Sequence, residues 1–232
     1  MALESDFYAQ LASEKGVILG GLLAAAAEKG PPLITQHLYG AGDTVFYAGN
    51  EPFGVYFIHH GVVKLFKSGR AGRLHITYMG GAGDLFGYRA LLAGELYKVT
   101  AQSHHEAKIS FIQKGFFLDY LRRDGRLSHY LLRTLSVELG DVEDRLVGAA
   151  QVSAERRVAR VLCFLRRSYG LGEDGSLRMD LSRTEMSELS DTAAETLMRC
   201  LGTLERRGMI SRDGRRVRIL DEPALKGAAG IA

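Results

Sequence analysis

The spacing of apolar residues changes partway along this chain, and that change limits what the chain can fold into. From Ile34 to Ile112, short apolar runs rich in Val, Ile, Phe and Tyr alternate with glycine-containing breaks. Short strands joined by glycine turns are typical of an antiparallel sandwich or jelly roll. From Arg126 onward, apolar residues instead recur in the steps of three and four that helices favour. The sequence therefore predicts an α+β protein with a β-rich part followed by a helical part.

Composition excludes several classes of protein. The chain has 232 residues, of which 46% are hydrophobic and 25% charged, as in ordinary globular proteins. The apolar stretch 17–27 contains Gly20 and Gly21, is short for a membrane span and follows acidic residues. We therefore expect a cytoplasmic protein without a signal peptide or a membrane partner. Cys163 and Cys200 provide neither a disulfide framework nor a four-cysteine metal site, so both are expected to be core thiols and no metal site is predicted.

One long helix is predicted over residues 126–150. Its apolar residues form a narrow stripe on an otherwise charged helix, which favours pairing with the same helix of a second copy. The alternative is a helix packed on its own domain. The stripe predicts a homodimer whose interface contains Leu127, Leu131, Leu135, Leu139, Val142 and Leu146.

The residues after 150 predict a winged helix-turn-helix. Ser153 can cap a first helix, and Ser182 with Glu185 forms a capping box for a short helix that ends at Leu189. A break at residues 190–192 precedes a longer helix over 193–207, and a hairpin over 209–219 follows with Asp213-Gly214 at its turn. The predicted organisation is a sensor domain over 1–125, a dimerisation helix over 126–150 and a DNA-binding domain over 151–232.

Positive charge gathers around this hairpin. The net charge of +3 is small, but arginines dominate one short segment, namely Arg206, Arg207, Arg212, Arg215, Arg216 and Arg218. Such a cluster is typical of a surface that binds an anionic partner, and double-stranded DNA fits the predicted motif. A solvated surface hairpin is the alternative that charge alone leaves open.

The longer helix of the predicted helix-turn-helix, over residues 193–207, supplies the candidates for base contacts. A recognition helix enters the major groove by its N-terminal turns, which here present Ala194, Glu195, Met198 and Arg199. A carboxylate can accept from the cytosine amino group, and a guanidinium can donate to guanine. Glu195 could alternatively pair with Arg199 or complete a capping box begun by Thr192. The predicted phosphate contacts are Arg183, Thr192, Thr196, Arg212, Arg215 and Arg216.

The run from Leu181 to Ser211 resembles the DNA-binding motif of the Crp/Fnr family of bacterial regulators, whose Glu-Thr-x-x-Arg core falls on Glu195, Thr196 and Arg199. The resemblance extends over nearly the whole chain and implies an N-terminal cyclic-nucleotide-binding-type β-roll. It also implies contact with RNA polymerase and a palindromic DNA site with TGA-like half-sites. Ala194 stands where the catabolite-activator branch has arginine, so the resemblance favours the Fnr-like side.

The resemblance does not extend to a cyclic-nucleotide site. With residues 83–87 aligned to the family's nucleotide cassette, Tyr88 replaces the ribose-binding glutamate and Glu95 falls near the position of the phosphate-binding arginine. On the long helix, Val142 and Glu143 replace the adenine-binding hydroxyls. Cyclic AMP is therefore not the expected effector, although Arg89 or Lys98 could replace the missing cation.

The cysteines, histidines and aromatic residues of the chain bear on other possible effectors. An Fnr-type iron-sulfur cluster is excluded because no cysteine precedes Cys163, whereas haem stays open because the chain has seven histidines. An organic effector could instead occupy a pocket against the long helix. Its candidate residues are Leu85, Phe86, Tyr88, Arg89, Tyr97, Lys98 and Val142, of which the apolar and aromatic members could equally be core.

The resemblance implies an allosteric mechanism. An effector bound in the roll would shift the paired long helices, and a hinge near residues 151–153 would reposition the recognition helices. No phosphate-binding glycine loop, nucleophile elbow or paired metal-ligand motif is present, so we do not expect an enzyme. A module whose winged helix only contacts protein is the rival function. The sequence leaves the effector's identity and the choice between activation and repression open.

Overall fold

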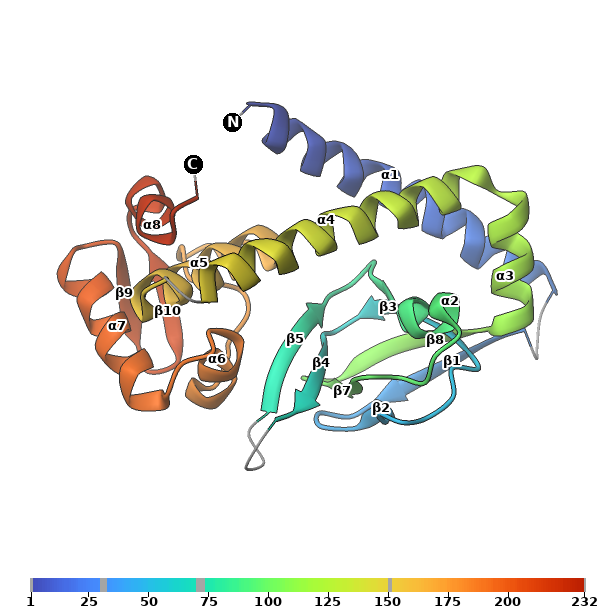
Figure 1. Ribbon diagram of the computed structural model, residues 1–232, viewed down its shortest axis with the longest axis horizontal. Coiled ribbons are helices and arrows are strands. Elements are labelled where there is room, and N and C mark those ends of the chain that lie inside the picture. The colour runs from blue at the N-terminus through green and yellow to red at the C-terminus, as the bar shows by residue number, and fades with distance from the viewer. Residues whose placement is uncertain (1, 30–32, 70–73, 150–151, 232) are drawn as a thin grey trace. The chain divides into compact units, whose positions relative to one another are not determined.

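The computed structural model describes residues 2–29, 33–69, 74–149 and 152–231, with elements labelled in Figure 1. Two compact units can be distinguished. One comprises Met1–Lys67 and Thr77–Asp144, and the other comprises Ser68–Ile76 and Arg145–Ala232.

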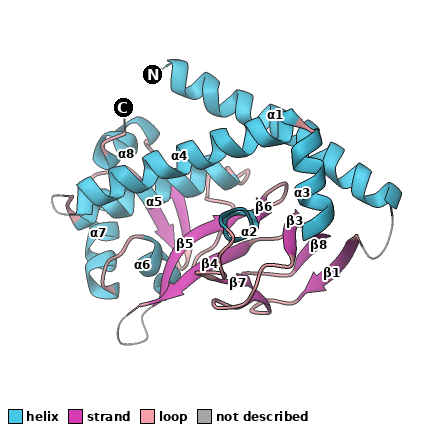
Figure 2. Cartoon of the chain, turned by 45° about the vertical axis from the view of Figure 1, so that its right-hand side comes forward, coloured by secondary structure: helices cyan, strands magenta, loops and turns pink. Residues whose placement is uncertain are grey.

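Two antiparallel four-stranded sheets form a β-roll, most of which belongs to the first unit, and Figure 2 shows their strands in magenta. One sheet has the order β1-β8-β3-β6 and the other the order β2-β7-β4-β5. This confirms the predicted β-roll. The strands are β1 (Ile34–Tyr39), β2 (Thr44–Phe46), β3 (Gly54–His60), β4 (Val63–Ser68), β5 (Leu74–Gly80), β6 (Leu85–Phe86), β7 (Thr100–Ser103) and β8 (Ala107–Gln113).

Alternation along the strands separates two apolar clusters. One contains Ile58, Ile109 and a set of aromatic side chains, among which the rings of Phe46 and Tyr97 are stacked with centroids 3.7 Å apart. The neighbouring positions on the same strands, such as Val55 and Ile112, join a second cluster with helical residues. The roll therefore has its own core and also carries a helical layer, because successive strand residues point to opposite faces.

Four helices belong mainly to this first unit. They are α1 (Ala2–Lys29), α2 (Tyr88–Ala93), α3 (Lys114–Arg123) and α4 (Gly125–Ala149). Helix α1 was not predicted from the sequence, and its residues Ile18, Leu19 and Leu22 are buried in the second cluster. Gly20 and Gly21 hid its helical character, because glycine disfavours helix interiors. Among the described residues, no helix is both long and apolar enough to span a membrane.

The second unit has the order of elements that the sequence predicts, with one further helix. The elements are α5 (Ala154–Tyr169), α6 (Arg183–Leu189), α7 (Ala194–Arg206), β9 (Ile210–Asp213), β10 (Arg216–Ile219) and α8 (Glu222–Ala229). The unpredicted α8 is capped by Asp221, whose side chain accepts a hydrogen bond from the Ala224 amide. It packs on α5, where the Arg156 and Arg160 guanidinium groups both donate to the Ala229 carbonyl. The hydrophobic core of this unit includes the fully buried residues Leu162, Leu165 and Leu225.

Candidate nucleic-acid interface

The first helix of the motif begins at a complete capping box. The Ser182 hydroxyl accepts from the Glu185 amide at 3.2 Å, and a Glu185 carboxylate oxygen accepts from the Ser182 amide at 3.1 Å. Two amides that the start of a helix would leave unpaired are thereby satisfied. The predicted start of α6 is confirmed.

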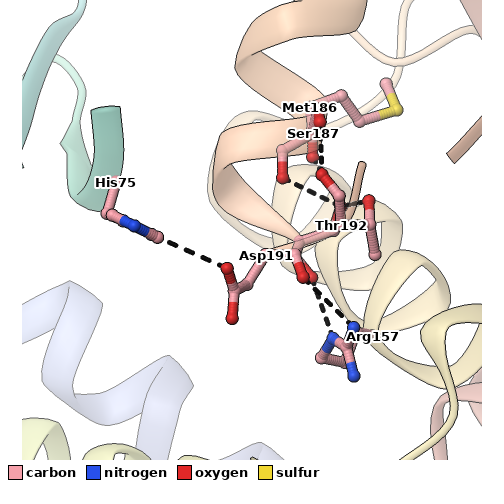
Figure 3. A network of polar contacts seen from close by, with 7 residues as sticks. His75, Arg157, Met186, Ser187, Asp191 and Thr192 are labelled. Carbon is pink, nitrogen blue, oxygen red and sulfur yellow. Dashed lines mark hydrogen bonds and ion pairs between the residues drawn. The ribbon is translucent and has the colours of Figure 1, made fainter. Parts of the chain in front are cut away.

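A single arginine holds the turn between α6 and α7. The Arg157 guanidinium donates to the carbonyls of Val152, Ser190 and Asp191 at 2.9, 3.0 and 3.1 Å, and the last two bonds are drawn in Figure 3. Asp191 has a φ of 47°, a left-handed conformation that Asp adopts more readily than most other residues. This positioning role could not be predicted from local sequence, because Arg157 is distant from the turn along the chain.

Thr192 does not play either of its predicted roles. The residue is 3% exposed, its hydroxyl lies 2.8 Å from the Ser190 hydroxyl, and its carbonyl accepts from Ser187. The N-cap of α7 is Ala193, which forms no side-chain cap. Thr192 therefore neither begins a capping box with Glu195 nor presents its side chain to a phosphate, because it packs inside the turn.

Helix α7 separates a buried face from an exposed one. Leu197, Cys200, Leu201 and Leu204 are buried. On the opposite side Ala194, Glu195 and Arg199 are exposed, while Met198 and Thr196 are half-buried. In the described part of the chain, the side chains of Glu195 and Arg199 take part in no hydrogen bond or ion pair with each other or with a third residue. Both remain available to an external partner.

The hairpin of β9 and β10 forms the wing, with Gly214 and Arg215 at its turn. Asp213 pairs with Arg216, so the two-residue turn lies one position later than predicted. Gly214 has a φ of 60°, and a glycine at the first position of such a turn is typical of type II′ hairpins. The side chains of Arg215 and Arg216 are exposed.

Arg212 has a different environment from the other wing arginines. Its Nε and Nη2 atoms donate to one Glu205 carboxylate oxygen at 3.0 and 2.6 Å, and its amide donates to the other oxygen at 3.0 Å. The Arg212 side chain is only 23% exposed, and its hydrogen bonds lower the pKa of Glu205. The structure therefore uses Arg212 to join the wing to α7, whereas the sequence predicts a phosphate contact.

A small hollow lies between the start of α6, α7 and the wing turn. Arg183, Met198 and Arg215 contribute to its walls, together with Leu181 and Val217. Arg183 and Arg215 are exposed, so two of the predicted phosphate-binding side chains lie at the edge of this hollow.

The predicted effector residues lie in two different environments. Leu85, Phe86, Tyr88 and Tyr97 are all buried and belong to the two apolar clusters, as in the alternative that assigned them to the core. Arg89 and Lys98 are exposed; Arg89 lies 3.9 Å from Glu138 of α4, and Lys98 contacts Glu95. Val142 is 46% exposed.

Glu138 also faces Tyr88. The Tyr88 hydroxyl donates to the Glu138 carboxylate at 3.4 Å, and burial, followed by the charge of Glu138, raises the pKa of Tyr88. The Glu138 carboxylate thus faces both Tyr88 and the Arg89 guanidinium, and its negative charge disfavours a phosphodiester there. Among the described residues, no group of three His, Cys, Asp or Glu side chains is arranged to hold a metal ion. The two cysteines are free, and burial raises the pKa of both thiols.

The predicted dimer stripe is divided by the structure. Leu127 and Leu131 are 0% and 3% exposed because they pack in the core of the first unit, so they are not available to a partner and this part of the prediction is wrong. Leu135 packs partly against the same core. Farther along α4, Leu139 is 58% exposed. The side chain of Leu146 lies outside the described residues, as does Gln151 of the predicted hinge.

An exposed stripe nevertheless exists on α4. Leu132, which the prediction omitted, is 64% exposed, and steps of three and four from it lead through Leu135 and Leu139 to Val142. The exposed positions therefore begin at Leu132 rather than at Leu127, with Leu135 only partly exposed, because the first turns of α4 complete the core of the roll.

Comparison with protein families identifies both parts of the chain. Residues 36–124 match the cyclic nucleotide-binding domain, and residues 156–228 match the Crp-like helix-turn-helix domain. The first range runs from within β1 to just past the end of α3, and the second runs from within α5 to within α8.

Individual relatives support the same assignment. The CRP-like cAMP-activated global transcriptional regulator of Mycobacterium tuberculosis is 27% identical over 186 residues, which is 79% of this chain and 83% of that protein. The fumarate and nitrate reduction regulatory protein of Escherichia coli is 26% identical over 191 residues, which is 82% of this chain and 76% of that protein.

Solved structures have the same fold. FixK2 of Bradyrhizobium japonicum aligns with a TM-score of 0.74 at 22% identity, covering 86% of this chain and 98% of that one. A CRP-family transcriptional regulator of Thermus thermophilus aligns with a TM-score of 0.67 at 26% identity, covering 84% and 97%. The two matched domains, their order and the recognition-helix geometry together place this chain in the Crp/Fnr family of transcriptional regulators, with a helix-turn-helix for DNA and an effector-binding type of β-roll.

Proposed function

We propose that this chain acts as a homodimer on a palindromic DNA site with TGA-like half-sites, which Glu195 and Arg199 recognise. The proposal rests on the exposure of these two side chains and on their lack of an ion pair among the described residues. Both are exposed on α7 and form no ion pair with any residue that the structure describes, while the opposite face of the helix is buried. A helix whose opposite face is packed in the core thus presents an exposed carboxylate and an exposed guanidinium, one turn apart, to base edges.

The chemistry of these groups matches base edges in the major groove. The Glu195 carboxylate accepts from a cytosine amino group, and the Arg199 guanidinium donates to guanine O6 and N7. Each such contact contributes about 1 to 3 kcal/mol of discrimination between bases. The TGA-like sequence itself comes from the resemblance to the family, in which the same glutamate and arginine positions recognise it.

Exposed arginines near α7 serve as phosphate contacts in this proposal. Arg183 at the start of α6 and Arg215 and Arg216 on the wing are all exposed. Contacts with phosphates fix the register of the protein on DNA and make affinity depend on salt, without selecting a base sequence. Thr196, half-buried at the start of α7, remains a candidate for the same role.

The two recognition helices of a homodimer would contact successive major grooves. The exposed part of α4 from Leu132 to Val142 supports the proposed pairing of two copies. We infer that an unidentified effector other than cyclic AMP controls this arrangement from the β-roll. The carboxylates of Glu138 and Glu95 lie beside the two candidate cations, Arg89 and Lys98, and their negative charge disfavours the phosphate of cyclic AMP there. As a regulator rather than an enzyme, the protein would act in the bacterial cytoplasm, where it meets DNA and RNA polymerase.

Selection from random duplex DNA tests this proposal. The purified full-length protein should enrich a palindrome with TGA-type half-sites, and its affinity for that duplex should fall steeply as salt increases. An absorption spectrum of the same sample would show a Soret band if haem is bound.

Two variants and a control make the test specific. Glu195→Ala and Arg199→Ala should each lose most of the preference for the selected duplex over a scrambled one, while retaining salt-dependent nonspecific binding. Arg206→Ala, at the other end of α7, should retain the preference. If no duplex is enriched, either without an added ligand or with any small molecule of a ligand screen, the winged helix acts through protein contacts and the proposal is wrong.

A further inference from the structure

Beside the acid and the base, the outward surface of α7 carries two apolar residues. Ala194 is exposed and Met198 is half-buried, and their separation of four residues places them on adjacent turns of the same face. Their side chains carry no strong hydrogen-bonding group. This face therefore combines an apolar pair with the charged pair formed by Glu195 and Arg199.

The surroundings of Met198 show where this apolar pair would meet DNA. Met198 lies in the wall of the hollow between α6 and the wing turn, together with Arg183 and Arg215. Those two arginines are exposed and carry the positive charge that suits phosphates. Met198 thus shares a hollow with two cationic side chains and is next to Arg199 on the same helix, so it would lie near the bases that Glu195 and Arg199 contact.

One base presents an apolar group in the major groove. Thymine carries a methyl group at C5, whereas the other base edges present mainly hydrogen-bond donors and acceptors that would lose water against a thioether side chain. We propose that Met198, with Ala194 beside it, contacts a thymine methyl group and selects thymine at one base pair next to those contacted by Glu195 and Arg199. This inference rests on the proposed function and adds a specificity-determining residue to it.

Replacement of thymine by deoxyuridine removes only the methyl group and therefore tests the inference directly. The selected palindrome is synthesised with deoxyuridine at one thymine position at a time, symmetrically in both half-sites, and affinity is measured by fluorescence anisotropy. For the unaltered protein, one position should show a loss of about three- to tenfold per half-site, as expected for one buried methyl group.

Variants of Met198 then connect that position to the side chain. Met198→Ala and Met198→Gln should bind the thymine and deoxyuridine duplexes almost equally, whereas Met198→Leu should retain the preference for thymine. Met198→Gln preserves the length of the side chain, so it remains informative if the alanine variant unfolds. Arg206→Ala, outside the apolar pair, should show the same methyl preference as the unaltered protein.

The outcomes separate this inference from the proposed function. If the palindrome is selected but deoxyuridine has no effect at any position, or the effect persists in Met198→Ala and Met198→Gln, Met198 merely packs in the hollow and the inference is wrong. If no palindrome is selected at all, the proposed function itself has failed.

Discussion

Arg212 illustrates how one side chain on a basic wing can serve the fold rather than the ligand. Its position in an arginine-rich hairpin predicts a phosphate contact, yet three hydrogen bonds join it to Glu205 on α7. Hydrogen bonds between charged groups contribute more than neutral ones, so this pair restrains the wing relative to the recognition helix. Arg215 and Arg216 remain exposed and free to neutralise phosphates.

Removal of the Glu205 carboxylate charge distinguishes these two roles of Arg212. If Arg212 positions the wing, Glu205→Gln and Arg212→Ala should each weaken binding to all duplexes by about the same factor. The double variant should then lose little more, because both changes remove one interaction. The measurement is affinity for the selected and scrambled duplexes at several salt concentrations.

The opposite pattern would restore the phosphate contact. In that case Glu205→Gln would release the arginine and strengthen binding. Arg212→Ala would weaken binding and reduce the slope of log affinity against log salt concentration by about one. Arg215→Ala serves as the control, because its exposed side chain should lower the salt dependence in either case.

Helix α4 performs different tasks along its length. Leu127 is fully buried in the core of the first unit, whereas Leu139 is 58% exposed. A residue such as Leu127 contributes to the folding of one chain, whereas the exposed apolar surface of Leu139 is available for burial against a second molecule. The same spacing of leucines therefore has two structural consequences.

Two substitutions on α4 should have separate effects. Leu127→Ala should lower the free energy of unfolding by about 2 to 5 kcal/mol, because it leaves a cavity in the core. Leu139→Lys should leave that free energy nearly unchanged and shift a dimer toward monomer. Chemical denaturation and sedimentation equilibrium measure the two quantities. A dimer that persists unchanged in both Leu139→Lys and Leu132→Lys would show that the exposed stripe is not the interface.

Acid should destabilise the molecule as a whole, because several carboxylates have lowered pKa values. Hydrogen bonds from Arg126, together with those from the Leu127 amide, lower the pKa of Asp124 to about 2. Hydrogen bonds from Ser176 lower the pKa of Asp174, and those from Arg212 lower the pKa of Glu205. A carboxyl group whose pKa is lower in the folded state stabilises that state above its unfolded pKa.

The resulting stability is present above about pH 4 and is lost as the pH falls toward 2, through the folded pKa of Asp124. Thermal unfolding measured between pH 7 and pH 2 should show this decline. Asp124→Asn should be less stable than the unaltered protein at pH 7, and the difference should shrink in acid, where Asp124 is protonated. An equal difference at both pH values would contradict the prediction. Asp119→Asn, at an exposed position, is the matched control.

Comparison of predicted and observed features shows which information is local. The capping box of Ser182 and Glu185, the extent of α7 and the glycine turn of the wing depend on residues a few positions apart, and the sequence predicts them closely. The exposed positions of Glu195 and Arg199 follow from the helical period once the buried leucines are assigned. The sequence by itself therefore determined the helix-turn-helix, the β-roll class and the candidates for base contacts.

Contacts between distant segments decided the rest. Arg157 lies far along the chain from the Ser190 and Asp191 carbonyls that it holds, and Thr192 is buried only because the α6–α7 turn closes around it. The period of α4 gives the positions of its leucines but not which of them face the roll. Side-chain spacing defines the faces of an element, whereas tertiary packing decides what covers each face, and that is why only the tertiary structure separated core from interface and Arg212 from the free arginines.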